Sequence, residues 1–439
     1  MASSHFLQLH GSDVSDSLDR LSELPDSLIL SILSLLSSTR DVVRTTVLSK
    51  RWKDLWTTVP YLELDDENPE FICGVVSQWR GAKIQRFYLC LSPPPTSTDL
   101  DSWLLFAVEK QLGELHLYAD IPYCPPQSLY SCSSITTLHL HDCSLEIEGS
   151  VQLNQLVTLS VHHIRNSSWV EAINKLLLGA PRLENMSLSV PEINGNFNIV
   201  SLSLKTLIIE EAEIKGVLAI SAPNLLTLRI HASIFNGARF LCHVPSLTEA
   251  CFVAWGLGSS AVYDPPLETF YQLLRSICHV KKVDSSLLNI KLLLSLKKKK
   301  KDMVVRFPNA EVLKHTSMGR QYNVLLDLVD VLDLLELFPE LKMLSFHQIH
   351  QEYFNSIAET TFPNCSLLHL ERVDMTWSAH DPSIIPFIQI LLQISPSLEK
   401  MVFRLRKCRD NLEEVLMVEE KVRSMPRSSP TAEVIIIDC

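Results

Sequence analysis

The sequence predicts an α/β protein in which a small three-helix unit is followed by a solenoid of parallel strands, with helices on the convex side. The first reason is composition. About one residue in six is leucine and only 12 of 439 residues are glycine, which favours stacked leucine-lined units over glycine-rich cofactor loops. The second reason is a spacing of apolar residues that returns along most of the chain. The third is a proline that returns just ahead of that spacing.

These signals divide the chain into five parts. Residues 1–19 are a polar leader that we expect to be disordered, and 20–58 form the three-helix unit. Repeats are expected over 70–260, an irregular insertion over 261–320, and terminal repeats with a distinct end region over 321–439. The length leaves room for two or three domains.

Charge and apolar patterning narrow the classes of partner. The formal net charge is −11, so neither nucleic acid nor an anionic membrane surface is an expected partner. Residues 1–20 lack the apolar stretch of a secretory signal. The leucine-rich run 324–338 has an acidic residue at every third position from 327, which argues against a membrane span. The eleven cysteines show no C-x-x-C spacing, as is usual in a reducing compartment. We therefore expect a chain of the nucleus, the cytoplasm or both.

Three helices are expected over 20–58. Pro25 and Asp26 suit a helix start, because proline has a fixed φ and an acidic residue is favoured by the helix dipole. Ser38 with Asp41 three positions later resembles a capping box that opens a second helix, and a third follows. The first helix is apolar on nearly all sides, so a unit this small has apolar surface left over. Either the second domain or a partner protein covers that surface.

The same residues resemble the F-box, the motif that binds Skp-family adaptors of cullin-RING ubiquitin ligases. The resemblance covers 20–58 and rests on the opening Leu-Pro, the isoleucine- and leucine-rich first helix and the closing S-K-R-W. It implies that a Skp-type adaptor, and through it a cullin scaffold, is a partner. The residues that it implies at or beside the adaptor interface are Leu24, Pro25, Leu28, Ile32, Val43 and Trp52.

Beyond this region, an apolar residue is repeatedly followed by two more, three and five positions later. From Leu112 to Leu225, successive units begin 21 to 27 residues apart, within the leucine-rich-repeat range of about 20–29 residues. The units begin at Leu112, Ile135, Leu156, Leu183, Leu204, Leu225, Leu341, Cys365 and Leu398.

A proline stands two positions before the first apolar residue of several units, as at Pro181 and Pro339. Proline ends a helix and biases the residue before it towards extended geometry. Each unit is therefore expected to run from a helix through a stop into a strand. The helices expected before these prolines are Trp169–Leu178, Val324–Phe338 and Phe387–Ile394.

Within each strand, the repeat leucines are expected to point into the core and the residues between them onto the concave face. That face is the candidate surface for a target protein, whose identity the sequence leaves unknown. A solvated polar strand face is the alternative interpretation. The candidates are His139, His141, His162, Glu210, Arg229, His231, His347 and Glu371, with His116, Tyr118, His369 and Arg404 alongside.

No catalytic residue, cofactor or metal site is predicted. The histidines come from different repeats and no carboxylate recurs beside them, which disfavours metal binding. Cys143 completes the L-x-x-L-x-L-x-x-C-x-L pattern, with Ile135 in first place, and is interpreted as a buried turn residue. The chain contains no G-x-G-x-x-G, P-loop, H-E-x-x-H or G-x-S-x-G motif.

The run Lys297–Lys301 lies in the expected insertion. It has two interpretations, a nuclear-import patch and a solvated loop between two segments of the solenoid. A nucleic-acid surface is disfavoured, because no arginine or aromatic pattern accompanies the lysines.

About the last hundred residues resemble the FBD region of plant F-box proteins. The matching segments are F-P-N-C-S-L-L-H-L-E-R-V, I-P-F-I-Q-I-L-L-Q-I-S-P-S-L-E-K-M-V-F and M-P-R-S-S-P-T-A-E-V-I-I-I. A charged helix is expected over Glu413–Ser424 and a closing strand over Glu433–Ile437, where it would cap the open edge of the solenoid.

Together these features predict a non-enzymatic adaptor, the substrate-recognition subunit of an SCF-type ubiquitin ligase. The F-box would bind the Skp-type adaptor and the repeats would bind the target. The alternative is a non-degradative scaffold that binds the adaptor without target turnover. The sequence alone does not separate these two functions.

Overall fold

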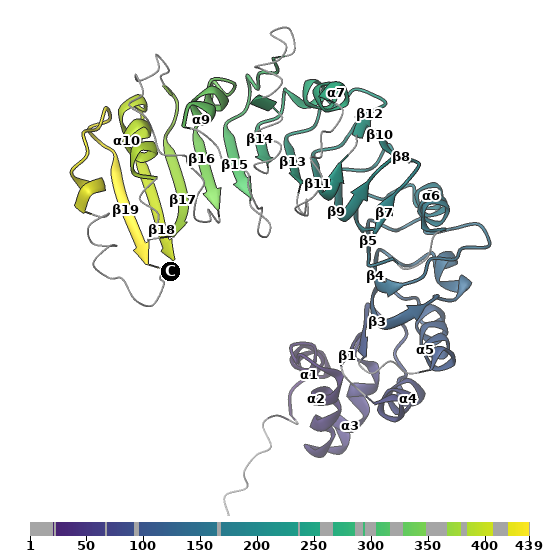
Figure 1. Cartoon of the computed structure of the whole chain (residues 1–439). Helices are drawn as coiled ribbons and strands as arrows, with labels where there is room; N and C mark the ends of the chain where they lie inside the picture. The colour runs from purple at the N-terminus through teal and green to yellow at the C-terminus, as the bar shows by residue number, and fades with distance from the viewer. Residues whose placement is uncertain are drawn as a thin grey trace, which may run out of the picture. The chain divides into compact units, whose positions relative to one another are not determined.

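The computed structural model divides the chain into two compact units, Met1–His116 and Leu117–Cys439. The predicted α/β fold class is confirmed, because helices open the first unit and parallel strands follow in both units (Figure 1). The predicted leader and Lys297–Lys301 lie outside the described residues. The structure describes residues 21, 23–65, 68–91, 96–164, 168–235, 238–254, 267–285, 293–294, 304–316, 328–347, 367–378, 384–406 and 420–438.

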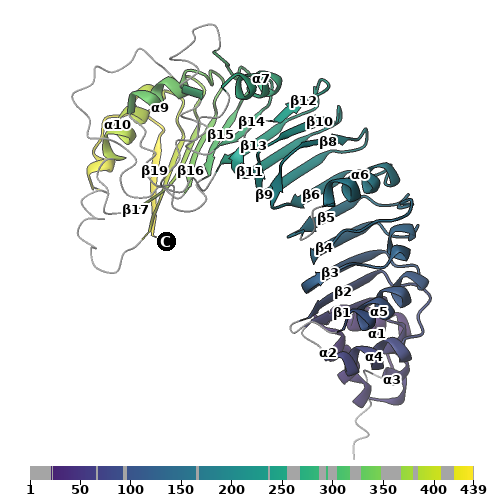
Figure 2. The same ribbon diagram turned by 45° about the vertical axis from the view of Figure 1, so that its right-hand side comes forward.

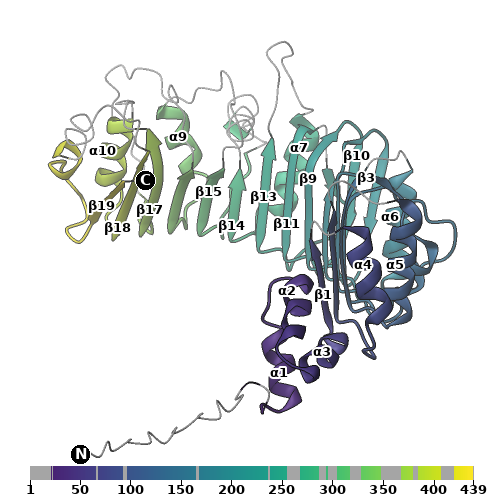
Figure 3. The same ribbon diagram turned by 90° about the horizontal axis from the view of Figure 1, so that it is seen from below.

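The three predicted N-terminal helices are present, as α1 (Asp26–Leu33), α2 (Thr39–Arg44) and α3 (Lys50–Leu55). Single 3₁₀ turns continue α2 and α3. Ser38 Oγ accepts a hydrogen bond from the Asp41 N–H at 3.2 Å, as the capping box predicts. Figure 3 shows the three helices grouped beside β1. The apolar residues buried among them are Ile29, Leu33, Val42, Trp52 and Trp56.

Two repeat strands of the first unit come earlier than the first repeat predicted from the sequence. In β1 and β2, which pair in parallel, Leu62 lies opposite Phe87 and Leu64 opposite Leu89, and all four side chains are buried. A strand with period-two burial therefore begins directly after the F-box-like helices. The further elements of this unit are β1 (Tyr61–Asp65), α4 (Pro69–Gln78), β2 (Arg86–Leu91), α5 (Ser97–Glu109) and β3 (Glu114–Tyr123), which continues into the second unit.

The second unit is built on one parallel sheet whose strands follow chain order, apart from the short β7 (Glu192–Ile193) beside β9. The closing strand predicted over Glu433–Ile437 is confirmed as β19, paired with β18. The strands are β4 (Thr137–Cys143), β5 (Thr158–His162), β6 (Asn185–Ser189), β9 (Thr206–Ile214), β11 (Thr227–Phe235), β13 (Glu249–Ala254), β14 (Lys282–Ser285), β15 (Val312–Thr316), β16 (Met343–His347), β17 (Arg372–Ser378), β18 (Lys400–Arg406) and β19 (Glu433–Asp438).

A relay of backbone hydrogen bonds connects the strand starts of successive repeats. The carbonyl of Val157 accepts from the N–H groups of Glu184 and Asn185, at 2.9 and 3.0 Å. The carbonyl of Glu184 in turn accepts from Lys205 and Thr206 of the next repeat. Because main-chain groups make these bonds, the strand register does not depend on which side chains face solvent. The relay continues through the carbonyls of Lys205, Leu226, Thr248, Lys281, Glu311, Lys342 and Glu371.

The labelled helices of the second unit lie on one side of this sheet (Figure 2). Two match the helices predicted before prolines, and the described part of the run 324–338 is helical at 328–335. None of the described helices is long and apolar enough to cross a membrane. The helices are α6 (Trp169–Gly179), α7 (Leu267–Ile277), α9 (Leu328–Leu335) and α10 (Ile384–Ile394).

A second, three-stranded sheet replaces the helix in three successive repeats. Its strands are β8 (Asn196–Val200), β10 (Val217–Ser221) and β12 (Ala238–Phe240), paired in parallel in the order β12-β10-β8. Phe197 of β8 packs edge-on against Trp169 of α6 with ring centroids 5.0 Å apart, so the sheet continues the layer that the helix begins. The sequence analysis did not predict this sheet.

The predicted division of each strand into core and face positions is confirmed over β4 to β11. The middle apolar residues Leu138, Leu159, Met186, Leu207 and Leu228 are all at most 1% exposed. They stand opposite one another in the strand registers. One leucine from each repeat therefore contributes to a continuous core.

The unit predicted to begin at Cys365 has the wrong register. Leu368 lies in a turn with 57% of its surface exposed, and the strand begins later, at Arg372. Val373 and Met375 are its buried residues, opposite Leu344 and Phe346 of β16. Val373 and Met375 also match the spacing from Leu370, so the correct unit is displaced by five residues from the predicted one.

The described part of the range 261–320 also departs from the prediction of an irregular insertion. Its helix α7 and its strands β14 and β15 continue the repeats, because β14 pairs with β13 and β15 pairs with β16. The inward positions there include Ser285 and His315 in place of leucine. This loss of leucine hides the repeat in the sequence.

Candidate functional site

Helix α1 has apolar residues on two faces. Ile29 and Leu33 point into the three-helix core and are fully buried. Leu28 and Ile32 are four residues apart and so share another face, and Leu35 lies in the turn that follows the helix. The serine stripe between these faces bonds to the helix backbone, as when Ser31 Oγ donates to the Ser27 carbonyl at 2.8 Å.

The exposed apolar surface of the F-box-like region, called the F-box surface below, extends beyond α1. Leu35 and Val47 are 85% and 86% exposed, which is unusual for large apolar side chains in a group. The members of this surface are Leu21, Leu28, Ile32, Leu35, Val47 and Leu48.

The structure separates the residues predicted at the adaptor interface. Leu28, Ile32 and Pro25 are exposed, and Leu24 and Val43 are half-buried. Trp52 is only 2% exposed and belongs to the core of the three helices. The sequence analysis missed Leu35, Val47 and Leu48. Leu35 lies two residues after the end of α1, so the helical spacing of Leu28 and Ile32 does not identify it.

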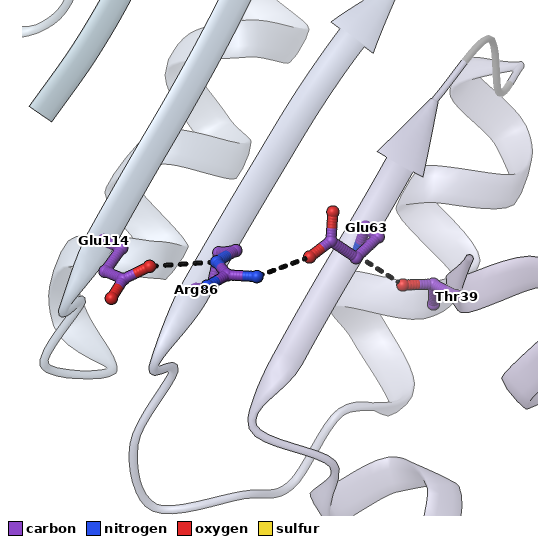
Figure 4. A network of polar contacts seen from close by, with 4 residues as sticks. All are labelled: Thr39, Glu63, Arg86 and Glu114. Atoms are coloured by element: carbon purple, nitrogen blue, oxygen red, sulfur yellow. Dashed lines mark hydrogen bonds and ion pairs between the residues drawn. The ribbon is translucent and has the colours of Figure 1, made fainter. Parts of the chain in front are cut away.

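A polar network attaches the F-box-like helices to the strands that follow them (Figure 4). Thr39, the first residue of α2, is 2% exposed, and its Oγ1 accepts from the Glu63 N–H of β1 at 2.8 Å. The Arg86 guanidinium of β2 lies between two carboxylates, with Nε 2.9 Å from Glu114 Oε2 and Nη1 3.5 Å from Glu63 Oε1. The hydrogen bond from Arg86 to Glu114 raises the Arg86 pKa. The network fixes the helices to the strands within the first unit.

In the second unit, the predicted face residues of β4, β5, β9 and β11 lie on the side of the sheet away from the core. His139 and His141 are on β4, and His162 is on β5 opposite His141. Glu210 is the fifth residue of β9. The neighbouring strand β11 carries two further predicted face residues. Those two are Arg229, which is exposed, and His231, which is half-buried.

Two predicted target-binding residues lie elsewhere. His347 ends β16, several strands further along the sheet. Glu371 is exposed in the turn before β17 and not within a strand, because the repeat there was assigned the wrong register. His369 lies in the same turn, with Nε2 3.7 Å from Glu340 Oε2. The structure therefore brings together six of the eight predicted target-binding residues.

Aromatic rings from adjacent strands form a row on this face, called the ring row below. The centroids of Tyr118 and His141 are 5.3 Å apart with planes at 32°, and those of His141 and His162 are 6.3 Å apart at 25°. His141 Nδ1 lies 2.7 Å from Asp142 Oδ2, and Ser160 Oγ is 2.7 Å from His162 Nε2. These contacts fix the ring orientations. Burial lowers the pKa of His162, so its ring is neutral near pH 7.

The cysteines on these strands are not suited to chemistry. Cys143 is fully buried, and its burial raises the thiol pKa to about 12. Cys251, 3% exposed, lies 3.4 Å from His231 Nε2, and burial raises its pKa as well. A thiol must ionise to act as a nucleophile or metal ligand, so neither is a reactive centre. Among the described residues, no group of His, Cys, Asp and Glu side chains has the geometry of a metal site.

Comparisons with known proteins match both parts of this architecture. The sequence model of the F-box domain matches residues 21–64. The model described as "FBD-associated F-box protein At5g56370, LRR repeats" matches residues 100–273. The first match contains α1 to α3, and the second contains the ring row.

Relatives of the chain come from Arabidopsis thaliana. F-box/LRR-repeat protein At3g03360 is 28% identical, over 88% of this chain and 84% of its own length. FBD-associated F-box protein At3g52670 is 29% identical, over 83% of this chain and 82% of its own length. F-box/LRR-repeat protein 25 is 31% identical, over 49% of this chain and 86% of its own length. The chain therefore belongs to the plant F-box/leucine-rich-repeat family.

Proposed function

We infer that an F-box followed by leucine-rich repeats gives this chain a substrate-adaptor role. We propose that it is the substrate-recognition subunit of an SCF-type cullin-RING ubiquitin ligase. The F-box surface binds a Skp-type adaptor, which links the chain to a cullin. The sheet face that carries the ring row binds the target protein. The nucleus or the cytoplasm is the proposed place of action.

The observation that carries this proposal is the F-box surface. Burying one leucine side chain contributes roughly 1.5–3 kcal/mol, so several exposed leucines on one small unit provide enough energy for a stable interface. Ile29 and Leu33 already fill the inner side of α1. The outer side is therefore available to a partner.

This role requires no catalytic residue in the chain. The receptor holds the target near an enzyme that the cullin scaffold recruits, which lowers the entropic cost of bringing a target lysine to the reacting centre. The buried, un-ionised thiols of Cys143 and Cys251 are consistent with such a division of labour.

A matched pair of variants tests adaptor binding. Leu28→Glu with Leu35→Glu places two charges on the F-box surface and should weaken capture of a purified Skp-type adaptor at least about tenfold. Leu178→Glu with Leu202→Glu changes two leucines that are 86% and 76% exposed in the second unit and should leave capture unchanged. Equal capture by both variants would refute the proposed interface.

Target turnover separates the ligase from a non-degradative scaffold. Proteins captured by the intact chain should accumulate when the proteasome is inhibited, and should accumulate in the Leu28→Glu/Leu35→Glu background without inhibition. If the abundance of the captured proteins changes neither on proteasome inhibition nor in the double variant, the chain is a non-degradative scaffold.

A further inference from the structure

The sheet face that carries the ring row combines aromatic rings with two carboxylates. Tyr118, His141 and His162 present rings on three adjacent strands, β3, β4 and β5. Two strands further on, Glu210 and Glu211 end the face-exposed part of β9. His163 connects the two groups, because its ring centroid lies 4.7 Å from that of His141 and its Nδ1 lies 3.6 Å from Glu211 Oε2.

The position of each carboxylate is fixed by a local contact. Glu211 Oε2 accepts from Ser189 Oγ at 3.0 Å and lies 3.6 Å from His163 Nδ1. Glu211 has a φ of 57°, in the left-handed region, and His163 has a φ of 53° at the end of β5. Glu210 is half-buried and close enough to His231 to act on its charge.

The described cations near Glu210 and Glu211 pair with other carboxylates. Among the described residues, no lysine or arginine forms an ion pair with either of them. Arg229 pairs with Glu249 at 2.7 Å, and Lys215 pairs with Glu192 and Glu213. The face therefore combines aromatic rings with two carboxylates that no described lysine or arginine pairs with.

We propose that this face binds an arginine-rich segment of the target protein. A guanidinium is planar, stacks on aromatic rings and forms paired hydrogen bonds with carboxylates. Lysine has the charge but not the planar shape, so it should bind more weakly. The net charge of −11 adds a long-range attraction that speeds the approach of a basic segment. The inference rests on the proposed function, in which this sheet face receives the target.

Short synthetic peptides test the proposal on the full chain by fluorescence anisotropy. Four peptides, in which glycine alternates with arginine, lysine, glutamine or glutamate, differ only in the side chain under test. Arginine should bind most tightly and lysine more weakly, with no binding of the glutamine and glutamate peptides. Glutamate binding as tight as arginine, or no arginine binding, would overturn the proposal.

Paired charge variants show where the peptide binds. Glu210→Gln with Glu211→Gln should weaken arginine-peptide binding roughly threefold to tenfold. Glu171→Gln with Glu268→Gln removes the same net charge from helices α6 and α7 and should change it less than about twofold. An equal effect from both pairs would show that only the overall charge attracts the peptide and would overturn the assignment of the site.

Tyr118→Leu tests the aromatic part of the site. It keeps an apolar side chain but removes the ring that begins the row, and should lower arginine-peptide affinity about twofold to fivefold. An unchanged affinity would remove the ring row from the site. Adaptor capture by the unchanged chain, measured beside its arginine-peptide binding, distinguishes the two proposals. Normal capture without arginine-peptide binding would refute only this inference, whereas loss of the adaptor assignment would refute the proposed function.

Discussion

Neighbouring residues of a repeat strand have opposite surroundings. Leu228 of β11 is fully buried opposite Leu207 and Ala250 of the adjacent strands. Arg229, the next residue, is on the face, where Nη2 lies 2.7 Å from Glu249 Oε1. The contribution of a side chain to the free energy of unfolding therefore alternates along the strand, because only every second residue removes apolar surface from water.

Leu228→Ala should lower the free energy of unfolding by about 2–5 kcal/mol, because the relay of backbone bonds prevents the strand from closing the cavity. Arg229→Ala should cost at most about 1 kcal/mol, the usual range for an exposed ion pair. Urea unfolding of the full chain measures both. Equal losses would contradict the strand register.

The buried histidines make stability depend on pH. Burial lowers the pKa of His116, His162 and His231 in the folded chain, whereas an unfolded imidazole titrates at about pH 6.5. Protons therefore bind more strongly to the unfolded chain. The stabilisation is complete above the unfolded pKa and is lost as the pH falls through and below it.

His162→Gln should reduce this dependence, because glutamine has no charge to gain while its amide can still bond Ser160. The midpoint urea concentration of the unchanged chain should decrease as the pH is lowered from about 7.5 to about 5.5. The midpoint of the variant should decrease less. Carboxylates titrate in both proteins, so only the difference between the two slopes reports on His162. Parallel slopes would show that this ring does not contribute.

At the scale of an element, α2 and β1 are joined through a buried hydroxyl. Thr39 Oγ1 is the acceptor for the Glu63 N–H, and Arg86 connects Glu63 to Glu114 across the next strands. A buried amide that loses its acceptor costs more than the bond itself contributes. Thr39 therefore contributes directly to the attachment of α2 to β1.

Thr39→Val preserves the shape of the side chain and removes the acceptor. It should lower stability by about 1–3 kcal/mol and speed hydrogen exchange of the Glu63 amide. Thr58→Val is the control, because Thr58 is exposed and its Oγ1 donates only to the Leu55 carbonyl. If the Glu63 amide exchanges at the same rate in both variants, the hydroxyl does not hold the strand.

Whether a strand could be predicted from the sequence depended on which side chains it contributes to the core. Strands with two inward leucines or isoleucines, such as β4 and β9, were located correctly. Strand β14 was missed because its inward residues are Val283 and Ser285, too few apolar atoms to form a recognisable pattern. The sheet of β8, β10 and β12 was missed because only the spacing of leucine units was followed, whereas Phe197 and Ile199 alternate with polar residues as in a strand.

The candidate site was predicted only in part for a related reason. Sequence spacing identifies which residues face outward, but not which of them meet. The row of Tyr118, His141 and His162 depends on strand order and register. Glu211 was missed because it follows the regular part of β9, where its φ of 57° breaks the alternation.

For the whole molecule, the two proposed binding surfaces lie on different compact units. The F-box surface is within Met1–His116 and the ring row within Leu117–Cys439. Effects of distant changes that share no partner normally add. Adaptor binding and arginine-peptide binding should therefore be energetically independent.

A double-mutant cycle measures that independence. The chain carrying both the Leu28→Glu/Leu35→Glu and the Glu210→Gln/Glu211→Gln changes should show the adaptor affinity of the first pair and the peptide affinity of the second. The coupling free energy should be within about 0.5 kcal/mol of zero. A larger value would mean that occupation of one surface is communicated to the other.

The carbonyl relay along the strand starts has an evolutionary consequence. In the described part of the relay, each strand start bonds to those of its two neighbours through main-chain groups. Duplication or loss of one repeat within the array therefore replaces one neighbour contact with an equivalent one, and the remaining repeats keep their bonding. A gene encoding such an array can change the outward-facing residues by recombination while keeping the fold and the adaptor surface. Families built in this way can diversify their targets faster than their scaffolds.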